Sequence, residues 1–193
     1  MDILSFLAEN FDLPILDWIA ENLYCPFLDF LMPIITLFGD AGIFWIAVAV
    51  VLLLIPKYRK IGLSMGAALL MGLLLCNVML KPLVARIRPY DYQLQNFGVT
   101  IQLLVEAQSD FSFPSGHTIA SFEAATALMI HNKKMGIPAM ILAVLIAFSR
   151  LYLYVHYPTD VLVSVALGIG IAFLACFLVK KGYSLYESRK KIA

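Results

Sequence analysis

Six long apolar runs constrain the fold of this chain more than any other feature. Crossing a hydrocarbon core of ~30 Å takes about 20 helical residues. We therefore predict six membrane-spanning helices, over residues 23–38, 41–55, 61–80, 117–130, 135–155 and 159–179. With 62% apolar and only 14% charged residues, the chain is too hydrophobic for a soluble domain of 193 residues. The predicted fold class is all-α: one domain, 1–193, that is a polytopic membrane bundle from 23 to 180.

The N-terminal segment, 1–22, carries Asp2, Glu9, Asp12 and Asp17, with no basic n-region and no small-residue cleavage site. We therefore expect it to remain in the mature protein rather than to be removed as a signal peptide. Its apolar residues recur at helical spacing, which predicts an amphipathic helix lying along the membrane interface. A cytoplasmic cap packed on the bundle is the alternative.

Basic residues near the ends of the predicted helices indicate the orientation, because cytoplasmic loops carry an excess of Lys and Arg. The residues that fall on one side are Lys57, Arg59, Lys60, Lys133, Lys134, Lys180, Lys181, Arg189, Lys190 and Lys191. With six spans, both termini are then cytoplasmic, including a tail over 181–193. The segment 81–115 and the turn around His156 face outward. Lys81, Arg86 and Arg88 are exceptions to this rule that a catalytic use would explain.

Three polar clusters stand at the edges of apolar runs, where helix ends could bring them to one interfacial pocket. They are Lys81 with Arg88-Pro89, Pro114-Ser115-Gly116-His117, and Ser149-Arg150 with His156 and Asp160. The guanidinium groups of Arg88 and Arg150 match phosphate oxygens, and Lys81 adds a compact charge. Because no Asp and Glu residues are spaced for Mg²⁺ binding, we predict metal-independent phosphate chemistry with no cofactor.

The second and third clusters supply the groups for hydrolysis. Ser115 can cap the helix that follows, and Gly116 lets backbone N–H groups approach an anion. Asp160 can orient one nitrogen of His156 and leave the other free to attack phosphorus, while His117 protonates the departing oxygen. Taken singly, each cluster also fits an ordinary helix start or a satisfied His–Asp pair.

The net charge and the cysteine residues give no evidence for another class of function. A net charge of +1 gives no indication of nucleic-acid binding. Cys25, Cys76 and Cys176 stand singly in apolar stretches, without the spacing of a zinc site or a disulfide framework, so we interpret them as small packing residues.

Together the clusters resemble the signature of the type 2 phosphatidic acid phosphatase superfamily, Lys-x6-Arg-Pro, Pro-Ser-Gly-His and Ser-Arg-x5-His-x3-Asp, in this order. The resemblance implies that His156 is the nucleophile that forms a phosphohistidine, that Asp160 orients it and that His117 is the general acid. It implies a phosphate-binding set of Lys81, Arg88, Ser115, Gly116 and Arg150. Arg86 lies outside the pattern; it contacts a second phosphate or a lipid headgroup, or is a solvated interface residue.

The resemblance is to compact bacterial membrane phosphatases, and membrane embedding favours a lipid substrate. We expect undecaprenyl diphosphate to be hydrolysed to undecaprenyl phosphate at the outer face of the membrane. Phosphatidylglycerol phosphate and phosphatidic acid are alternatives, and a non-catalytic lipid-phosphate carrier is an alternative of another class. The segment 90–113 is expected to roof the site, or to form a short interfacial helix around 99–107.

Overall fold

The computed structural model describes the backbone of residues 3–190 and the side chains of residues 3–188, and this part of the chain is helical without a β-strand. The predicted all-α fold is confirmed. Of the basic residues behind the predicted orientation, Lys191 and the side chains of Arg189 and Lys190 lie outside the described part.

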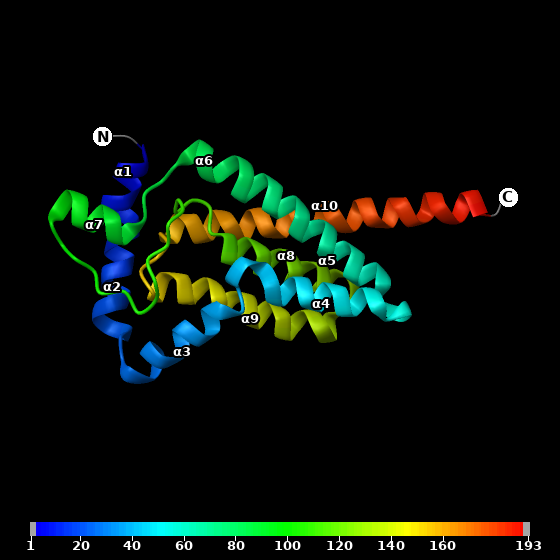
Figure 1. The fold of residues 1–193 in the computed structure, drawn as a ribbon, viewed down its shortest axis with the longest axis horizontal. Helices are drawn as coiled ribbons and strands as arrows, with labels where there is room; N and C mark the ends of the chain where they lie inside the picture. Colours follow the sequence, from blue (N-terminus) through cyan, green and yellow to red (C-terminus); the bar gives the residue numbers. More distant parts are fainter. Residues whose placement is uncertain (1–2, 191–193) are drawn as a thin grey trace.

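The bundle is built from five long helical segments and a cap at one end (Figure 1). The cap consists of α1 (Ile3–Leu7), the π-helix η1 (Ala8–Asp12), α2 (Leu13–Leu23) and α7 (Pro89–Phe97). The long segments are α3 (Pro26–Leu37) with α4 (Ile43–Leu54), α5 (Arg59–Gly72) with the π-helix η4 (Leu73–Leu80) and α6 (Lys81–Val84), α8 (Gly116–His131), α9 (Lys133–Tyr152) and α10 (Pro158–Lys190). Short 3-10 turns join α3 to α4 and α4 to α5.

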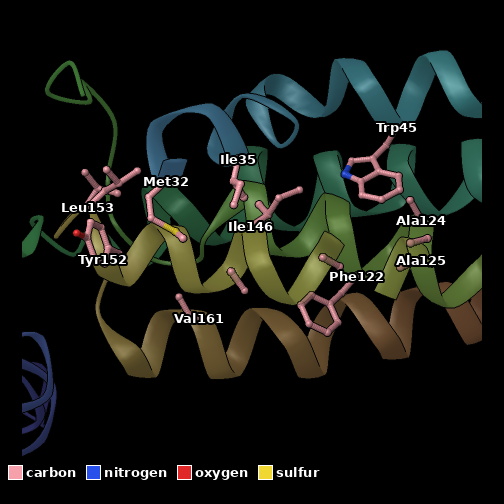
Figure 2. Close-up of a cluster of buried hydrophobic side chains, with 14 of the residues drawn as sticks. Met32, Ile35, Trp45, Phe122, Ala124, Ala125, Ile146, Tyr152, Leu153 and Val161 are labelled. Carbon is pink, nitrogen blue, oxygen red and sulfur yellow. The ribbon is translucent and has the colours of Figure 1, made fainter. Parts of the chain in front are cut away.

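The core lies around α8, which packs against α5, α9 and α10. Its middle is a run of small, fully buried residues that includes Ala124 and Ala125, and small residues allow helices to approach closely. Trp45 of α4 and Phe122 lie near these alanines (Figure 2). The indole N–H of Trp45 donates to Ser121 Oγ at 3.0 Å, so the polar edge of this buried ring is satisfied.

The outer surface of the bundle is apolar. Large side chains such as Phe30 (70% exposed), Leu54 (72%) and Leu162 (61%) point away from the core. A soluble monomer rarely exposes so much contiguous apolar surface, whereas hydrocarbon is the favourable solvent for it. By length and composition, four segments within the described residues can cross a membrane: Pro26–Leu54, Pro56–Phe97, Lys133–Tyr152 and Pro158–Ser188.

The first two predicted spans, 23–38 and 41–55, fall within a single candidate span. Helices α3 and α4 have 12 residues each, about 18 Å, which is too short for a ~30 Å core. They follow one another along the long axis instead of turning back (Figure 1), and together they are one candidate span of 29 residues. The 16-residue α8 packs against α9 and α10. The described residues thus form five helical segments along the bundle, where the sequence predicted six spans.

The arrangement of α3 and α4 also determines where the two described ends of the chain lie. The helices α1 and α2 lie at one end of the long axis, and the end of α10 lies at the other (Figure 1). The described ends of the chain therefore lie at opposite ends of the bundle, whereas six antiparallel spans would bring them to the same end. The physical reason is the turn over residues 39–42, which a hydropathy pattern does not distinguish from a hairpin between two spans.

The N-terminal helices form a cap that lies across the end of the bundle where α7 and the start of α10 lie (Figure 1). Asp12 is fully buried and accepts hydrogen bonds from the backbone N–H of Thr159 at 2.8 Å and from its hydroxyl at 2.7 Å. Glu9 accepts from Tyr92 Oη of α7 at 2.7 Å. The cap thus packs on the bundle, as in the alternative we considered, at the end opposite the basic turns.

Candidate active site

The three polar clusters converge at the capped end of the bundle, around a cavity of about 540 Å³. Six of the predicted site residues line it: Lys81, Arg88, Gly116, His117, Arg150 and His156. They come from α6, the start of α7, the first turn of α8, the end of α9 and the turn before α10. Asp160 and Ser115 do not line the cavity, because both are buried and form hydrogen bonds with other residues of the fold.

Ser115 is the N-cap of α8, as predicted. Its Oγ accepts from the Thr118 hydroxyl at 2.9 Å and from the Thr118 backbone N–H at 3.4 Å. Its own backbone N–H donates to Ser164 Oγ at 2.8 Å. Both groups are therefore engaged within the fold, and Gly116 and His117 are the residues of this motif that reach the cavity.

His156 lies in the turn between α9 and α10 with its ring buried. On the cavity side, its Nε2 is 3.3 Å from Arg88 Nη1. Burial, followed by the charges of Arg88, Arg150 and Lys81, holds the pKa of His156 well below its ordinary value. The ring is therefore neutral at physiological pH and keeps the lone pair that a nucleophile needs.

Asp160 lies beside the opposite edge of this ring, but the two do not form a direct hydrogen bond. His156 Nδ1 is 3.6 Å from Asp160 Oδ2, which is beyond hydrogen-bonding distance. Ser112 Oγ lies between them, 3.4 Å from Nδ1, and donates to Asp160 Oδ2 at 2.5 Å. The predicted His–Asp pair is thus supplemented by a serine that sequence reasoning missed.

Arg86 links Asp160 to the N-terminal cap. Its guanidinium donates to Asp160 Oδ1 at 2.6 Å and to Asp12 Oδ2 at 2.7 Å, and its Cζ lies 3.6 Å from the ring centre of Tyr157. The side chain is 5% exposed. Both interpretations of Arg86 from the sequence, a phosphate or headgroup contact and a solvated interface residue, are therefore wrong, because two buried carboxylates engage the group.

Asp110 joins two of the predicted phosphate ligands. Its carboxylate forms ion pairs with Lys81 and with Arg88, the latter at 2.5 Å. Burial raises the pKa of Asp110, but the hydrogen bonds and charges of Lys81 and Arg88 outweigh it and lower the pKa to about 2. The Asp110 side chain is 52% exposed, so this carboxylate sits at the cavity mouth, where an incoming anion meets the same two cations.

The guanidinium of Arg150 has N–H donors that form no hydrogen bond with the described residues. Its Nη1 donates to Thr36 Oγ1 of α3 at 2.5 Å, whereas Nε and Nη2 are buried and have no hydrogen-bond partner among the described residues. Buried polar groups are nearly always paired, so unpaired guanidinium donors on a cavity wall favour an anionic ligand.

His117 contacts a carboxylate that the sequence did not single out. Its Nε2 is 2.6 Å from Asp40 Oδ1, in the turn between α3 and α4. A carboxylate can only accept, so this ring nitrogen donates its N–H. The local sequence makes the approach possible: a Cβ on Gly39 would lie 2.7 Å from His117 Cδ2.

The segment between α7 and α8 differs from the predicted interfacial helix. The helix lies earlier, at Pro89–Phe97, and Gly98 ends it with a φ of 68°, which favours glycine. Residues 99–115 are irregular and bring Ser112 and Asp110 to the site. In the sequence, only the position of Asp110 and Ser112 just before Pro114 of the second cluster indicates that they could belong to the site.

The inner part of the cavity is apolar, with one polar exception. Its walls between α4 and α5 include Ile46, Val50, Leu53, Leu69 and Leu70. Glu123 of α8 also lines it, is 1% exposed, and its Oε1 has no partner among the described residues. Gly72 makes room for this carboxyl, because a Cβ there would lie 1.7 Å from Glu123 Oε1. Within the described chain, no three His, Cys, Asp or Glu side chains are grouped to hold a metal ion.

Comparison with known proteins agrees with this geometry. An undecaprenyl-diphosphatase from Sulfolobus acidocaldarius is 37% identical over 139 residues, 72% of this chain and 65% of that protein, so the chain spans just under two thirds of its relative. The crystal structure of a transmembrane PAP2-type phosphatidylglycerolphosphate phosphatase from Bacillus subtilis superposes with a TM-score of 0.69 at 28% identity, covering 92% of this chain and 90% of that one.

The same fold occurs in LpxE from Aquifex aeolicus, whose crystal structure superposes with a TM-score of 0.73 at 24% identity and covers 91% of this chain and 98% of that one. The sequence model of the PAP2 superfamily matches residues 59–183, which include all three polar clusters. The chain therefore belongs to the PAP2 superfamily.

Proposed function

We propose that the protein hydrolyses a lipid phosphate or diphosphate through a phosphohistidine on His156, without a metal ion. The observation that carries this proposal is the position of His156 Nε2, which faces the cavity 3.3 Å from Arg88 Nη1. A neutral imidazole next to fixed cations can attack a phosphorus atom whose oxygens those cations bind.

Each predicted residue that lines the cavity then has a role. Lys81, Arg88 and Arg150 bind the phosphate oxygens and stabilise the charge of the transition state. Gly116, at the start of α8, adds backbone donors and the favourable end of the helix dipole. His117 protonates the leaving oxygen and afterwards activates the water that hydrolyses the phosphohistidine.

The inner cavity supports a lipid substrate. It extends from the cations to the apolar side chains of α4 and α5, whose outer faces are themselves hydrophobic. An amphiphile can place its phosphate among the cations while its chain stays in an apolar environment. Our first candidate is undecaprenyl diphosphate, which is the substrate in the name of the Sulfolobus relative.

Purified protein in detergent with EDTA should release phosphate from undecaprenyl diphosphate, and His156→Ala should abolish the release while the melting temperature stays close to that of the wild type. Acid-quenched protein should carry label from a ³²P-labelled substrate, and His156→Ala should not. A non-catalytic carrier would bind the lipid without releasing phosphate. Full activity of His156→Ala would exclude the phosphohistidine, and activity that EDTA removes would exclude the metal-free route.

Glu123 favours a second candidate, a glycerolipid phosphate such as phosphatidylglycerol phosphate or phosphatidic acid. It lies six residues after His117 on α8, about 9 Å along the helix axis. An ester carbonyl or a hydroxyl of a glycerolipid can hydrogen-bond to a carboxyl group at this depth, whereas an isoprenoid chain offers no oxygen there. Relative to the wild type, Glu123→Leu should lower kcat/KM on phosphatidylglycerol phosphate more than on undecaprenyl diphosphate, and Glu123→Gln should lower it less. Equal changes on both lipids would reject this role.

We also propose a revised orientation, with the active site outside. Basic residues of three helices, including Lys60 of α5, Lys133 of α9 and Lys180 of α10, lie away from the cavity, toward the opposite end of the bundle. The positive-inside rule places that end in the cytoplasm. With five crossings, the N-terminal cap is then outside with the site, and the end of α10 is cytoplasmic.

A further inference from the structure

The turn between α3 and α4 serves the site rather than only joining two helices. One helical turn before it, Thr36 accepts a hydrogen bond from Arg150, and within it Asp40 accepts one from His117. Ala41 and Gly42 have φ values of 48° and 66°, and an alanine adopts the left-handed region only at a cost in conformational energy. Such local strain persists only where surrounding contacts fix it.

The neighbours of His117 oppose a positive charge on its ring. The charged or titratable groups that act on it from the surrounding elements are Arg150, Arg88, Lys81 and His156, and Asp40 is the carboxylate in direct contact with it. A general acid has to carry a proton before it can donate one, and three nearby cations disfavour an imidazolium. The negative charge of Asp40 works in the opposite direction.

We propose that Asp40 is a positioning residue for His117: its carboxylate holds the Nε2–H of the ring, so that Nδ1 carries the proton for the leaving oxygen. This rests on the proposed function, in which His117 is the general acid. Asp40 acts only through the histidine and does not touch the phosphorus.

The proton balance is complete with these groups. In the first step, His156 Nε2 bonds to phosphorus, the bond from phosphorus to the leaving oxygen breaks, and the Nδ1 proton of the His117 imidazolium moves to that oxygen. His117 is then neutral and still donates Nε2–H to Asp40. In the second step, water attacks phosphorus, the bond to His156 breaks, and His117 Nδ1 takes the proton of the water.

The test uses the dependence of the rate on the leaving group. An alkoxide leaving from phosphatidic acid needs protonation far more than a phosphate ester leaving from undecaprenyl diphosphate. Asp40→Asn should therefore lower kcat on phosphatidic acid about 10- to 100-fold, a part of the usual contribution of a general acid. On undecaprenyl diphosphate, kcat should fall only a few-fold, KM should change little on either lipid, and the basic limb of the kcat profile should move to lower pH. Asp40→Glu should restore part of the activity.

Asp29→Asn is the matched control, because Asp29 lies in α3, the helix before the turn of Asp40, accepts from Tyr152 Oη at 2.6 Å and does not line the cavity. It should leave the ratio of the two rates unchanged. Equal losses on both lipids in Asp40→Asn, with an unshifted pH profile, would overturn the proposal.

A second measurement does not depend on turnover. In ¹⁵N-histidine-labelled protein, the Nε2–H proton of His117 should resonate at low field, as expected for a short hydrogen bond to a carboxylate. The signal is assigned by its loss in His117→Gln, and it should move upfield in Asp40→Asn. If the wild type hydrolyses neither lipid, the proposed function fails while this signal still reports the contact; an unchanged signal in Asp40→Asn would reject the role of Asp40.

Discussion

Arg86 Nη1 donates a hydrogen bond to Asp160 Oδ1 at 2.6 Å, and the same guanidinium binds Asp12 of the N-terminal cap. The side chain proposed to orient the nucleophile is therefore held by a residue two positions before Arg88, a proposed phosphate ligand, in the sequence. Because Asp12 and Asp160 are both fully buried, their negative charges depend on this single guanidinium.

Arg86→Gln should destabilise the protein and reduce activity on every substrate. Removing one partner of a buried ion pair typically costs about 3–5 kcal/mol, because the remaining charge stays buried. We expect a clear fall in melting temperature and a loss of kcat. Arg59→Gln removes an exposed arginine and should change neither quantity. A stable, fully active Arg86→Gln would show that Asp160 does not need this support.

Gly39→Ala should impair activity by displacing His117, since the added Cβ would lie 2.7 Å from His117 Cδ2 and 3.0 Å from Ile146 Cγ2. Misplacing a catalytic group by about 1 Å can reduce the rate roughly 100-fold. Steady-state kinetics should show the loss in kcat. Gly170→Ala, whose Cβ would meet no atom within 4 Å, is the control and should remain active.

The meeting of the three clusters at one cavity was predictable from the sequence, because each cluster is a short motif with regular spacing. Lys81, Arg88, His117 and His156 stand out because charged and imidazole groups are rare beside apolar runs, and all of them reach the cavity. The helical character of the chain was equally clear, because apolar length alone distinguishes membrane helices.

Other site residues left no local signal. Asp40 and Asp12 are single carboxylates whose partners lie far away in the chain, His117 and Arg86 respectively, and only tertiary packing brings them together. The tandem arrangement of α3 and α4 was missed for a related reason. Hydropathy reports where a helix can be buried, but not whether the next helix turns back or continues.

The stability of the protein should fall below neutral pH because of His156. Its pKa in the folded protein lies below the ordinary value of 6.5, so the unfolded chain takes up a proton that the native ring resists. The resulting loss is absent above pH 6.5 and grows as the pH falls toward the folded-state pKa, with a limiting slope of about 1.4 kcal/mol per pH unit. His156→Asn should lose this part of the pH dependence in melting temperatures recorded from pH 7.5 to 5. Parallel curves for the two proteins would contradict the assignment.

Asp110→Asn should strengthen product inhibition by inorganic phosphate. In the wild type, the Asp110 carboxylate competes with an anion for Lys81 and Arg88. A half-exposed ion pair contributes up to ~1 kcal/mol, so we expect the inhibition constant to fall by up to about 5-fold. Asp91→Asn, on the neighbouring helix α7, is the control. Weaker inhibition in Asp110→Asn would mean that Asp110 holds the cations in place more than it competes for them.

The topology predicts which single cysteines react from outside the cell. With Cys25, Cys76 and Cys176 replaced by alanine, Asn10→Cys in the cap and Ser188→Cys near the end of α10 both present exposed positions. The orientation that we propose places these two sites on opposite faces of the membrane. A membrane-impermeant maleimide added to intact cells should label Asn10→Cys, and Ser188→Cys should react only after permeabilisation. Protection of both sites in intact cells would restore the six-span topology, because only an even number of crossings leaves both termini in the cytoplasm.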